Sequence, residues 1–313
     1  MTLPLTRPTE YAATSKAFQK AYHSTLLLGH ALDRVLLAKY DGVCGLAVFE
    51  TGRTPRMLSR TGEDYSASCQ AILGALERAL QYAGWNGAAL MVAGEVWRKD
   101  CPQPKISGDF RQQHSVIRDF QFRVFDAVYL HAPPESQPYH VRMDRYRAFT
   151  RHRPSPTLQD QTFITYAQTV RPSPGQTPEQ LAREMGPGYD GVVLWDLNGL
   201  PLWDEKAKQG QAIKFKPNIT VDVRCTGGIQ GEGKHYGRLG ALTYVTADGK
   251  VGSVGTGFSD AYRERIWAAL MRRDGASSCV GDIFEVEAMG YTPDGNLREP
   301  RFKGFRFDKK ESD

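Results

Sequence analysis

The sequence lacks any long apolar run. Its apolar runs, such as those at residues 26–28 and 35–38, are all far shorter than the roughly 20 consecutive apolar residues that a membrane-spanning helix needs. The first residues also lack the apolar stretch and the small-residue cleavage site of a secretory signal. We therefore expect a cytoplasmic protein with no membrane partner.

Cysteine is scarce. No two cysteines are spaced as C-x-x-C, and their number is odd: Cys44, Cys69, Cys101, Cys225 and Cys279. A structural zinc site or a disulfide scaffold needs paired or closely spaced cysteines, so neither is expected. Reduced thiols are the simplest interpretation.

The sequence also has no large excess of positive or negative charge. Lys and Arg number 40 against 35 Asp and Glu, which gives a net charge of +5. The whole surplus lies in the first 216 residues, because residues 217–313 contain equal numbers of basic and acidic side chains. This bias favours a polyphosphate ligand for the first part of the chain.

The composition is otherwise that of a globular protein. Hydrophobic residues make up 41%, charged residues 24%, and the mean hydropathy is −0.46, which excludes a disordered or coiled-coil chain. A length of 313 residues predicts two domains.

The hydrophobic pattern of the first 216 residues predicts mixed helices and strands. Apolar side chains recur at three- and four-residue intervals over residues 65–83, which predicts a helix. A second helix is predicted after Thr177, where a capping box has Pro178 at the first helical position and Gly186 lies at the expected end. Strands are predicted at 35–49, around an Asp41-Gly42 turn, and at 56–60, 88–97, 120–130, 191–195 and 211–216.

The pattern changes after residue 217. Short strands alternate there with glycine-rich turns, and a single helical stretch is predicted near residues 260–272. This combination predicts a small five-stranded barrel with one helix.

Lys39 is the first residue that suggests chemistry. A strand leads into it and is followed by the tight Asp41-Gly42 turn, which would present the amine at the floor of a groove. Lys214 and Lys216 lie two apart on a predicted strand, so both point to one face, where two ammonium groups suit a phosphate. Asp190, at the start of another strand, could hold a hard cation such as magnesium.

Taken in order, these segments resemble the covalent nucleotidyltransferases, and most closely the short ATP-dependent DNA ligases of the bacteriophage type. The resemblance extends from about residue 39 to residue 309, with the family's motifs in the correct order. The matching segments are Lys39-Tyr40-Asp41-Gly42, Ser59-Arg60-Thr61-Gly62, Gly94-Glu95, Val124-Phe125-Asp126, Asp190-Gly191-Val192-Val193, Lys214-Phe215-Lys216, Leu297-Arg298-Glu299-Pro300-Arg301-Phe302 and Arg306-Phe307-Asp308-Lys309.

The resemblance implies an α+β fold. Residues 1–216 would form the adenylylation (nucleotidyltransferase) domain, with ATP-grasp-like antiparallel sheets and helices. Residues 217–313 would form a C-terminal OB-fold β-barrel. The role of residues 1–30 is left unassigned.

The resemblance also implies roles for individual residues. Lys39 would be the nucleophile that becomes lysyl-AMP, and Asp190 would hold Mg²⁺ or Mn²⁺. Glu95 would take the ribose hydroxyls and Phe125 would stack on the adenine. The remaining nucleotide-binding residues would be Leu37, Ala38, Tyr40, Arg60, Lys214, Lys216, Arg306 and Lys309.

Lys39 must lose its proton before it can attack. A free lysine has a pKa of about 10.4 and is almost entirely protonated near neutral pH. Cationic neighbours lower such a pKa. Lys214, Lys216 and a bound magnesium ion are expected to supply that charge.

The implied activity is ATP-dependent sealing of nicks in duplex DNA through lysyl-AMP and DNA-adenylate intermediates. Such an enzyme would act as a monomer in DNA replication, repair or recombination, in a bacterial or phage-infected cell. Basic side chains mixed with aromatic ones are predicted to contact the DNA phosphates. The candidates are Arg142, Arg145, Arg147, Arg151 and Arg153.

Three positions depart from the family pattern. Cys44 stands where the family usually has an arginine, Leu37 where many members have glutamate, and Asp190 where glutamate is usual. These departures leave three alternatives open: an mRNA capping guanylyltransferase that uses GTP, an RNA ligase, and an inactive nucleic-acid-binding protein that contains an OB-fold.

Overall fold

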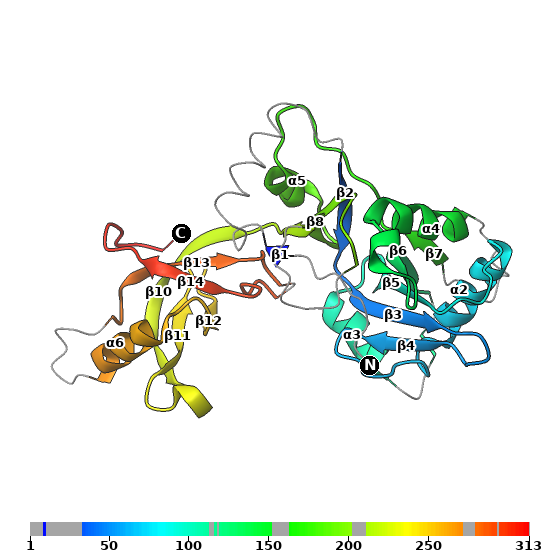
Figure 1. The fold of residues 1–313 in the computed structure, drawn as a ribbon. Helices are drawn as coiled ribbons and strands as arrows, with labels where there is room; N and C mark the ends of the chain where they lie inside the picture. Colours follow the sequence, from blue (N-terminus) through cyan, green and yellow to red (C-terminus); the bar gives the residue numbers. More distant parts are fainter. Residues whose placement is uncertain are drawn as a thin grey trace. The chain divides into compact units, whose positions relative to one another are not determined.

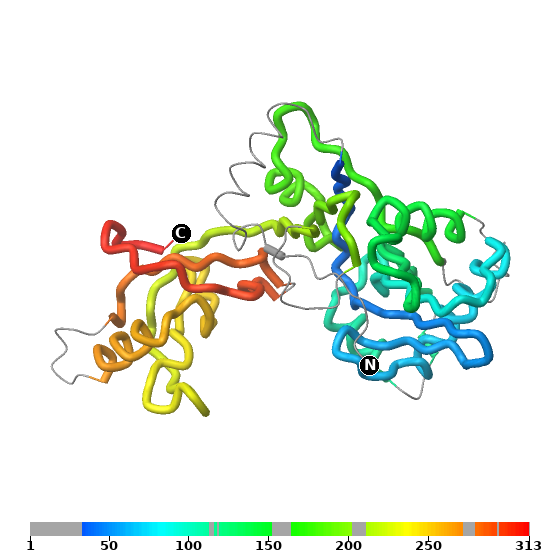
Figure 2. The backbone as a smooth tube through the Cα atoms, viewed as in Figure 1, coloured from blue at the N-terminus to red at the C-terminus, as the bar shows by residue number. Residues whose placement is uncertain are grey.

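The computed structural model describes residues 9–10, 33–112, 116–117, 119–151, 163–201, 211–271, 279–292 and 294–312. The chain divides into two compact units, Met1–Lys216 and Pro217–Asp313. Figure 1 labels their helices and strands, and Figure 2 traces the backbone of each. Among the described residues, no helix is both long enough and apolar enough to cross a membrane.

The first sheet of the first unit is buried on both faces. Leu36, Val192 and Ile213 pack on one face with Ala182 of a short helix, whereas the neighbouring Leu37 and Val193 join the main core on the other face. The central residues of β2 and β8 are therefore apolar on both faces, as expected where a sheet is covered on both sides. In sheet order they are β1 (Thr9–Glu10), β9 (Ala212–Phe215), β8 (Tyr189–Asp196) and β2 (Arg34–Tyr40), and only β1 and β9 run parallel.

The short helix on this sheet is α5 (Pro178–Glu184), which begins as the sequence predicts. The Thr177 side chain accepts a hydrogen bond from the Gln180 N–H, and the Gln180 side chain accepts one from the Thr177 N–H. Gly186 follows the helix with a φ of 74°, a left-handed conformation that glycine adopts readily.

The second sheet is antiparallel except at one edge, and helices cover its core face. In sheet order the strands are β4 (Arg56–Ser59), β3 (Val43–Phe49), β5 (Leu90–Trp97), β6 (Gln121–Tyr129) and β7 (Phe163–Tyr166), with β6 and β7 parallel. The helices are α2 (Gln70–Tyr82), α3 (Gln103–Arg111), the 3-10 turn η2 (Pro134–Ser136) and α4 (Tyr139–Arg151). The helix predicted over residues 65–83 begins only at Gln70, because Asp64 accepts hydrogen bonds from the Ser66 N–H and hydroxyl and holds a turn there.

The second unit is the predicted five-stranded barrel with one helix. Its strands, all antiparallel, are β12 (Val251–Val254), β11 (Leu239–Val245), β10 (Ile219–Gln230), β13 (Ile283–Ala288) and β14 (Arg301–Phe305) in sheet order. A bridge between Thr256 and Arg301 joins the two edges, and the Phe302 N–H donates to the Thr256 carbonyl at 2.9 Å. The helix is α6 (Asp260–Met271), and the β10–β11 connection contains the turn η3 (Gly233–His235).

Gly191 permits the close approach of β8 and β9. Its φ is 105°, and a Cβ built on it would lie 2.0 Å from the Phe215 carbonyl oxygen. We expect Gly191→Ala to destabilise the first unit by about 3 kcal/mol or more, through both backbone strain and this clash. The measurement is the midpoint of urea unfolding.

Gly186→Ala is the matched control for Gly191→Ala. Gly186 also has a positive φ, but an added Cβ there meets nothing within 4 Å. Only the conformational penalty of about 1–2 kcal/mol is expected. Equal losses in the two variants would show that the approach of β9 to Gly191 is not the constraint.

Candidate active site

Lys39 and Asp190 meet at an irregularity between β2 and β8. Ala38 lies opposite Val192 and Tyr40 lies opposite Tyr189, so Lys39 alone faces the two residues Asp190 and Gly191. Such a bulge turns side chains out of the regular alternation. Here it brings the Lys39 ammonium group into contact with the Asp190 carboxylate.

Lys216 contacts the same carboxylate. Its Nζ lies 3.6 Å from Oδ2 of Asp190, whose side chain is only 7% exposed. Lys216 directly follows β9, the neighbour of β8, while Lys214 lies within β9 opposite Val193. The structure therefore brings Lys39, Asp190 and Lys216 together from three adjacent strands.

Glu95 is the second carboxylate of the site. It lies in β5 opposite Cys44, and its carboxylate accepts a hydrogen bond from the Gly42 N–H. A Cβ on Gly42 would lie 2.8 Å from Glu95 Cγ and 2.3 Å from the Val96 carbonyl oxygen, so the turn after Lys39 needs glycine. Burial raises the pKa of Glu95 to about 7, with Asp190 adding to the rise and Lys39 opposing it.

The pKa of Lys39 is raised, whereas the sequence predicts that it is lowered. Burial lowers it, but the combined charges of Asp190, Glu95 and Asp41 outweigh that effect and raise it above the ordinary value. The prediction that neighbouring cations lower this pKa is therefore wrong for the chain's own side chains, because carboxylates dominate the surroundings of Lys39. The Lys39 amine is held protonated through neutral pH.

Asp190 fits the predicted magnesium site. Its Oδ1 is buried and has no hydrogen-bond partner, so a lone pair remains for a hard cation. Within the described part of the chain no cluster of three or more His, Cys, Asp or Glu side chains could hold a metal. Magnesium is commonly held by one or two carboxylates together with substrate phosphates, which is the arrangement that this single carboxylate allows.

Phe125 lies at a second bulge, in β6. Ala93 is opposite Asp126 and Gly94 is opposite Val124, which leaves Phe125 as the extra residue of the pair β5–β6. Its ring is partly buried and stacks 6.3 Å from the ring of Trp195 in β8. The spacing of the sequence motifs identifies neither the bulge nor the contact with Trp195. Both depend on which residues the folded strands bring together.

Three other predicted nucleotide-binding residues belong largely to the core. The Tyr40 ring is 3% exposed and packs against Trp97 and Tyr189. The Leu37 and Ala38 side chains are also buried, and the Ala38 N–H donates to the Gln168 carbonyl at 2.8 Å, so it is not available to an adenine edge. Arg60, in contrast, is exposed in the turn after β4.

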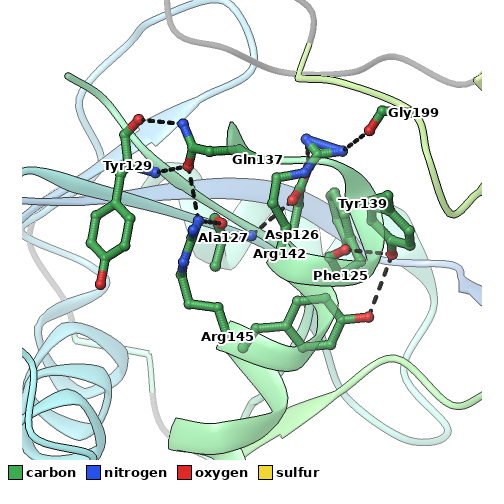
Figure 3. Close-up of polar contacts among 10 residues, drawn as sticks. Phe125, Asp126, Ala127, Tyr129, Gln137, Tyr139, Arg142, Arg145 and Gly199 are labelled. Atoms are coloured by element: carbon green, nitrogen blue, oxygen red, sulfur yellow. Dashed lines mark hydrogen bonds and ion pairs between the residues drawn. The ribbon is translucent and has the colours of Figure 1, made fainter. Parts of the chain in front are cut away.

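The prediction that Arg142 contacts DNA is wrong. Arg142 and Asp126 are each 1% exposed and form an ion pair at 3.3 Å (Figure 3). Arg145 donates to the Ala127 carbonyl at 2.6 Å, and Arg147 donates to the Thr169 hydroxyl at 3.0 Å. A run of arginines predicts a basic surface only when it faces solvent, and here the helix turns Arg142 toward the sheet. Arg153 lies outside the described residues.

In the second unit, Arg306 and Lys309 surround a buried carboxylate. Arg306 lies 3.4 Å from Asp222 and 3.1 Å from Glu285, and the Lys309 ammonium group contacts Asp222, which is 2% exposed. The hydrogen bond from Arg306 lowers the pKa of Asp308 to about 2. A shallow pocket next to this cluster is lined by Gly281, Asp282, Ile283, Arg306, Phe307, Lys309 and Lys310.

Comparison with known families finds one match, within the second unit. Residues 230–306 match the DNA ligase OB-like domain. No curated protein sequence matches the chain. The sequence evidence for a relationship therefore comes from this domain.

Solved structures resemble the chain over almost its full length. Pmar-Lig_PreS3 is 24% identical with a TM-score of 0.69, over 92% of this chain and 66% of its own. Pmar-Lig_Pre. is 22% identical with the same TM-score, over 96% and 67%, so this chain spans about two thirds of the length of these two proteins. A Lig E DNA ligase, described as binding DNA with a minimal scaffold, is 17% identical with a TM-score of 0.61, over 96% of this chain and 100% of its own. The predicted α+β fold with a C-terminal OB-fold is confirmed.

Asp190→Asn should lower the pKa of Lys39. The substitution removes the largest charge that raises this pKa, while burial, which lowers it, remains. Because only the neutral amine is nucleophilic, we expect chemical modification of Lys39 to begin at lower pH in the variant. The measurement is the pH profile of Lys39 modification by an amine-reactive reagent, followed by peptide mass spectrometry.

Asp196→Asn is the control for this pH profile. Asp196 ends the same strand, β8, but its carboxylate lies 4.0 Å from Arg34. The Lys39 profile should match that of the wild type in this variant. An unchanged profile in Asp190→Asn would contradict the electrostatic account of the site.

Proposed function

Because the chain has the fold of the DNA ligases, we propose that it is an ATP-dependent DNA ligase that seals nicks in duplex DNA. Lys39 is the nucleophile, Met1–Lys216 is the adenylylation domain, and Pro217–Asp313 is the OB-fold domain. The observation that carries the proposal is the contact of two lysines with the buried Asp190 carboxylate of β8: Lys39, which begins the K-x-D-G segment, and Lys216. The enzyme acts as a monomer in DNA replication, repair or recombination.

In the first step the Lys39 amine attacks the α-phosphorus of ATP. The N–P bond forms as the bond to pyrophosphate breaks, and the amine proton is lost. The chain alone keeps Lys39 protonated through the charge of Asp190, so activation requires that this charge be neutralised. A magnesium ion bound by Asp190 would supply that positive charge and would also neutralise the phosphate oxygens.

The other charged side chains complete the nucleotide site. When the metal ion occupies Asp190, Lys216 is released from that carboxylate. Lys216 and Lys214 then stabilise the negative charge that develops on the phosphates. Glu95 holds the ribose, in a position fixed by the Gly42 N–H. Phe125 stacks on the adenine, Arg60 contacts the nucleotide or the nick phosphate, and Arg306 and Lys309 of the OB-fold domain bind the β- and γ-phosphates.

In the second step AMP passes from Lys39 to the 5′-phosphate of the nick. The neighbouring 3′-hydroxyl then attacks the activated phosphorus, AMP leaves, and the phosphodiester bond closes. Contacts to phosphates rather than to bases would govern DNA affinity, so binding should depend steeply on salt and little on sequence.

Covalent labelling tests the first step. The wild type, Lys39→Ala and Lys105→Ala are incubated with magnesium and α-labelled ATP or GTP. We expect ATP to label the wild type and Lys105→Ala, whereas Lys39→Ala loses at least about a thousandfold of the signal because the nucleophile is gone. Lys105 is a suitable control because it is exposed on α3 and lies near Asp109.

Addition of nucleic acid tests the second step. We expect the label to leave the wild type when a singly nicked DNA duplex is added, with joining of the strands. Transfer of a GTP-derived label to an RNA end with a 5′-diphosphate would instead identify a capping enzyme. Wild-type protein that takes no label from either nucleotide would contradict the proposal.

A further inference from the structure

Three consecutive residues of β6 are held by three side chains of α4 (Figure 3). The Tyr139 hydroxyl donates to the Phe125 carbonyl at 2.8 Å, Arg142 pairs with Asp126 at 3.3 Å, and Arg145 donates to the Ala127 carbonyl at 2.6 Å. Tyr139, Arg142 and Arg145 are spaced three apart. Three residues of a helix span about 4.5 Å along its axis, and one residue of a strand spans about 3.3 Å. These two distances are similar, so every third residue of α4 can reach the next residue of β6.

The first of these contacts supports the bulge at Phe125. The extra residue of a bulge is left out of the regular ladder, so its backbone groups need other partners. The Tyr139 hydroxyl is such a partner for the Phe125 carbonyl. The position of Phe125 therefore depends on α4 as well as on its own sheet.

Tyr139 also contacts the strand that carries Asp190. Its ring stacks on that of Trp195 in β8 with centroids 4.3 Å apart and planes 8° apart, and Trp195 in turn stacks beside Phe125. The first turn of α4 is tied to the end of β8, because the His140 N–H donates to the Leu197 carbonyl at 2.8 Å. Tyr139 thus links the bulge in β6 of the second sheet to β8 of the first sheet, the strand that contains Asp190.

We propose that Tyr139 is a positioning residue for the nucleotide: it fixes Phe125 relative to Asp190 and thereby sets the affinity of the site for ATP. The inference rests on the proposed function, in which Phe125 stacks on the adenine. Tyr139 does not touch the nucleotide and acts through the Phe125 backbone and the Trp195 ring.

Tyr139→Phe tests this role because it removes only the hydroxyl and keeps the stack on Trp195. The loss of one hydrogen bond is worth about fivefold in an equilibrium. We expect the KM for ATP in lysyl-AMP formation to rise about fivefold, with little change in kcat and a fall of only about 2–4 °C in the melting temperature. Substitution of Arg142 is less informative, since it would leave the buried Asp126 unpaired and destabilise the fold.

Tyr146→Phe is the matched control. Tyr146 is buried on the same helix, its hydroxyl lies 3.4 Å from that of Tyr139, and it makes no recorded contact with the bulge backbone. Its KM should equal that of the wild type. Phe125→Ala completes the design: if Tyr139 acts through Phe125, then Tyr139→Phe should raise KM no further once Phe125 is alanine.

The outcomes separate this inference from the proposed function. Normal labelling of the wild type together with an unchanged KM in Tyr139→Phe overturns the positioning role alone. Additive losses in the double variant also overturn it, because they mean that Tyr139 acts independently of Phe125. A wild type that takes no label from ATP overturns the proposed function and this inference with it.

A second, independent observation concerns two cysteines of the OB-fold domain. The Sγ atoms of Cys225 in β10 and Cys279 just before β13 lie 3.9 Å apart, and both side chains are buried. The Cys225 N–H donates to the Asp282 carbonyl and the Gly281 N–H donates to the Cys225 carbonyl, each at 2.8 Å. The turn 279–282 is thereby held against β10.

The two thiols are chemically unequal. The hydrogen bond between them lowers the pKa of Cys225, whereas that same bond, together with burial, raises the pKa of Cys279. A thiolate is the form that attacks a disulfide. No other pair of thiols is recorded in contact among the described residues, so this pair differs from the remaining cysteines.

We infer that Cys225 and Cys279 are a site of oxidative modification. A small-molecule disulfide is attacked by one thiolate and releases one thiol; the second cysteine then displaces the other thiol and forms the Cys225–Cys279 bond. The two protein thiols lose two electrons and two protons, which reduce the small disulfide to two thiols. Gly281 and Asp282 line the pocket of Arg306 and Lys309, so the bond would tie to β10 the turn that contributes to this pocket.

Oxidised glutathione is the probe for this site. After incubation, free thiols are alkylated and the peptides are mapped by mass spectrometry. We expect a Cys225–Cys279 link that dithiothreitol reverses, that Cys225→Ser abolishes and that Cys69→Ser leaves intact. A fully alkylated pair, or only mixed disulfides with glutathione, would overturn the inference.

Discussion

The Asp190 carboxylate lies between the ammonium groups of Lys39 and Lys216, and the first sheet is arranged so that these three side chains meet. The bulge between β2 and β8 turns Lys39 toward Asp190, and the absence of a side chain at Gly191 lets β9 deliver Lys216. A buried carboxylate without cations would be strongly disfavoured, and two half-buried lysines without a carboxylate would repel each other. Each charge therefore depends on the others, and in the proposed function a nucleotide with its metal ion would exchange partners with this group rather than enter a neutral cavity.

This arrangement gives the site a resting state and a reactive state. With the chain's own charges, Lys39 has a raised pKa and is protonated. Glu95, with a pKa of about 7, is poised near neutrality beside it. A cation that occupies Asp190 reverses the balance and favours the neutral amine. In the proposed function, the reactivity of Lys39 would therefore depend on the binding of its substrate, which would limit modification of the amine in the absence of substrate.

The sequence predicted the elements far better than their contacts. The hydrophobic pattern located most strands of the first unit, the capping box at Thr177 located α5, and the ordered motifs indicated the candidate site residues Lys39, Asp190, Glu95 and Phe125. Arg142 was assigned to DNA because its helix is rich in arginine, yet it is buried against Asp126; the pattern of charges does not show which helix face packs on the sheet. The raised pKa of Lys39 and the bulge at Phe125 depend on strand pairing between residues far apart in the chain, and no local pattern records that pairing.

The central claim is that Lys39 carries the nucleotide. The most direct measurement is peptide mass spectrometry of the protein after reaction with ATP and magnesium, with digestion at alkaline pH because a phosphoramidate bond is labile to acid. The account predicts AMP on Lys39 alone, released when nicked DNA is added. AMP on Lys214 or Lys216, or an unmodified Lys39 in protein that joins nicks, would contradict it.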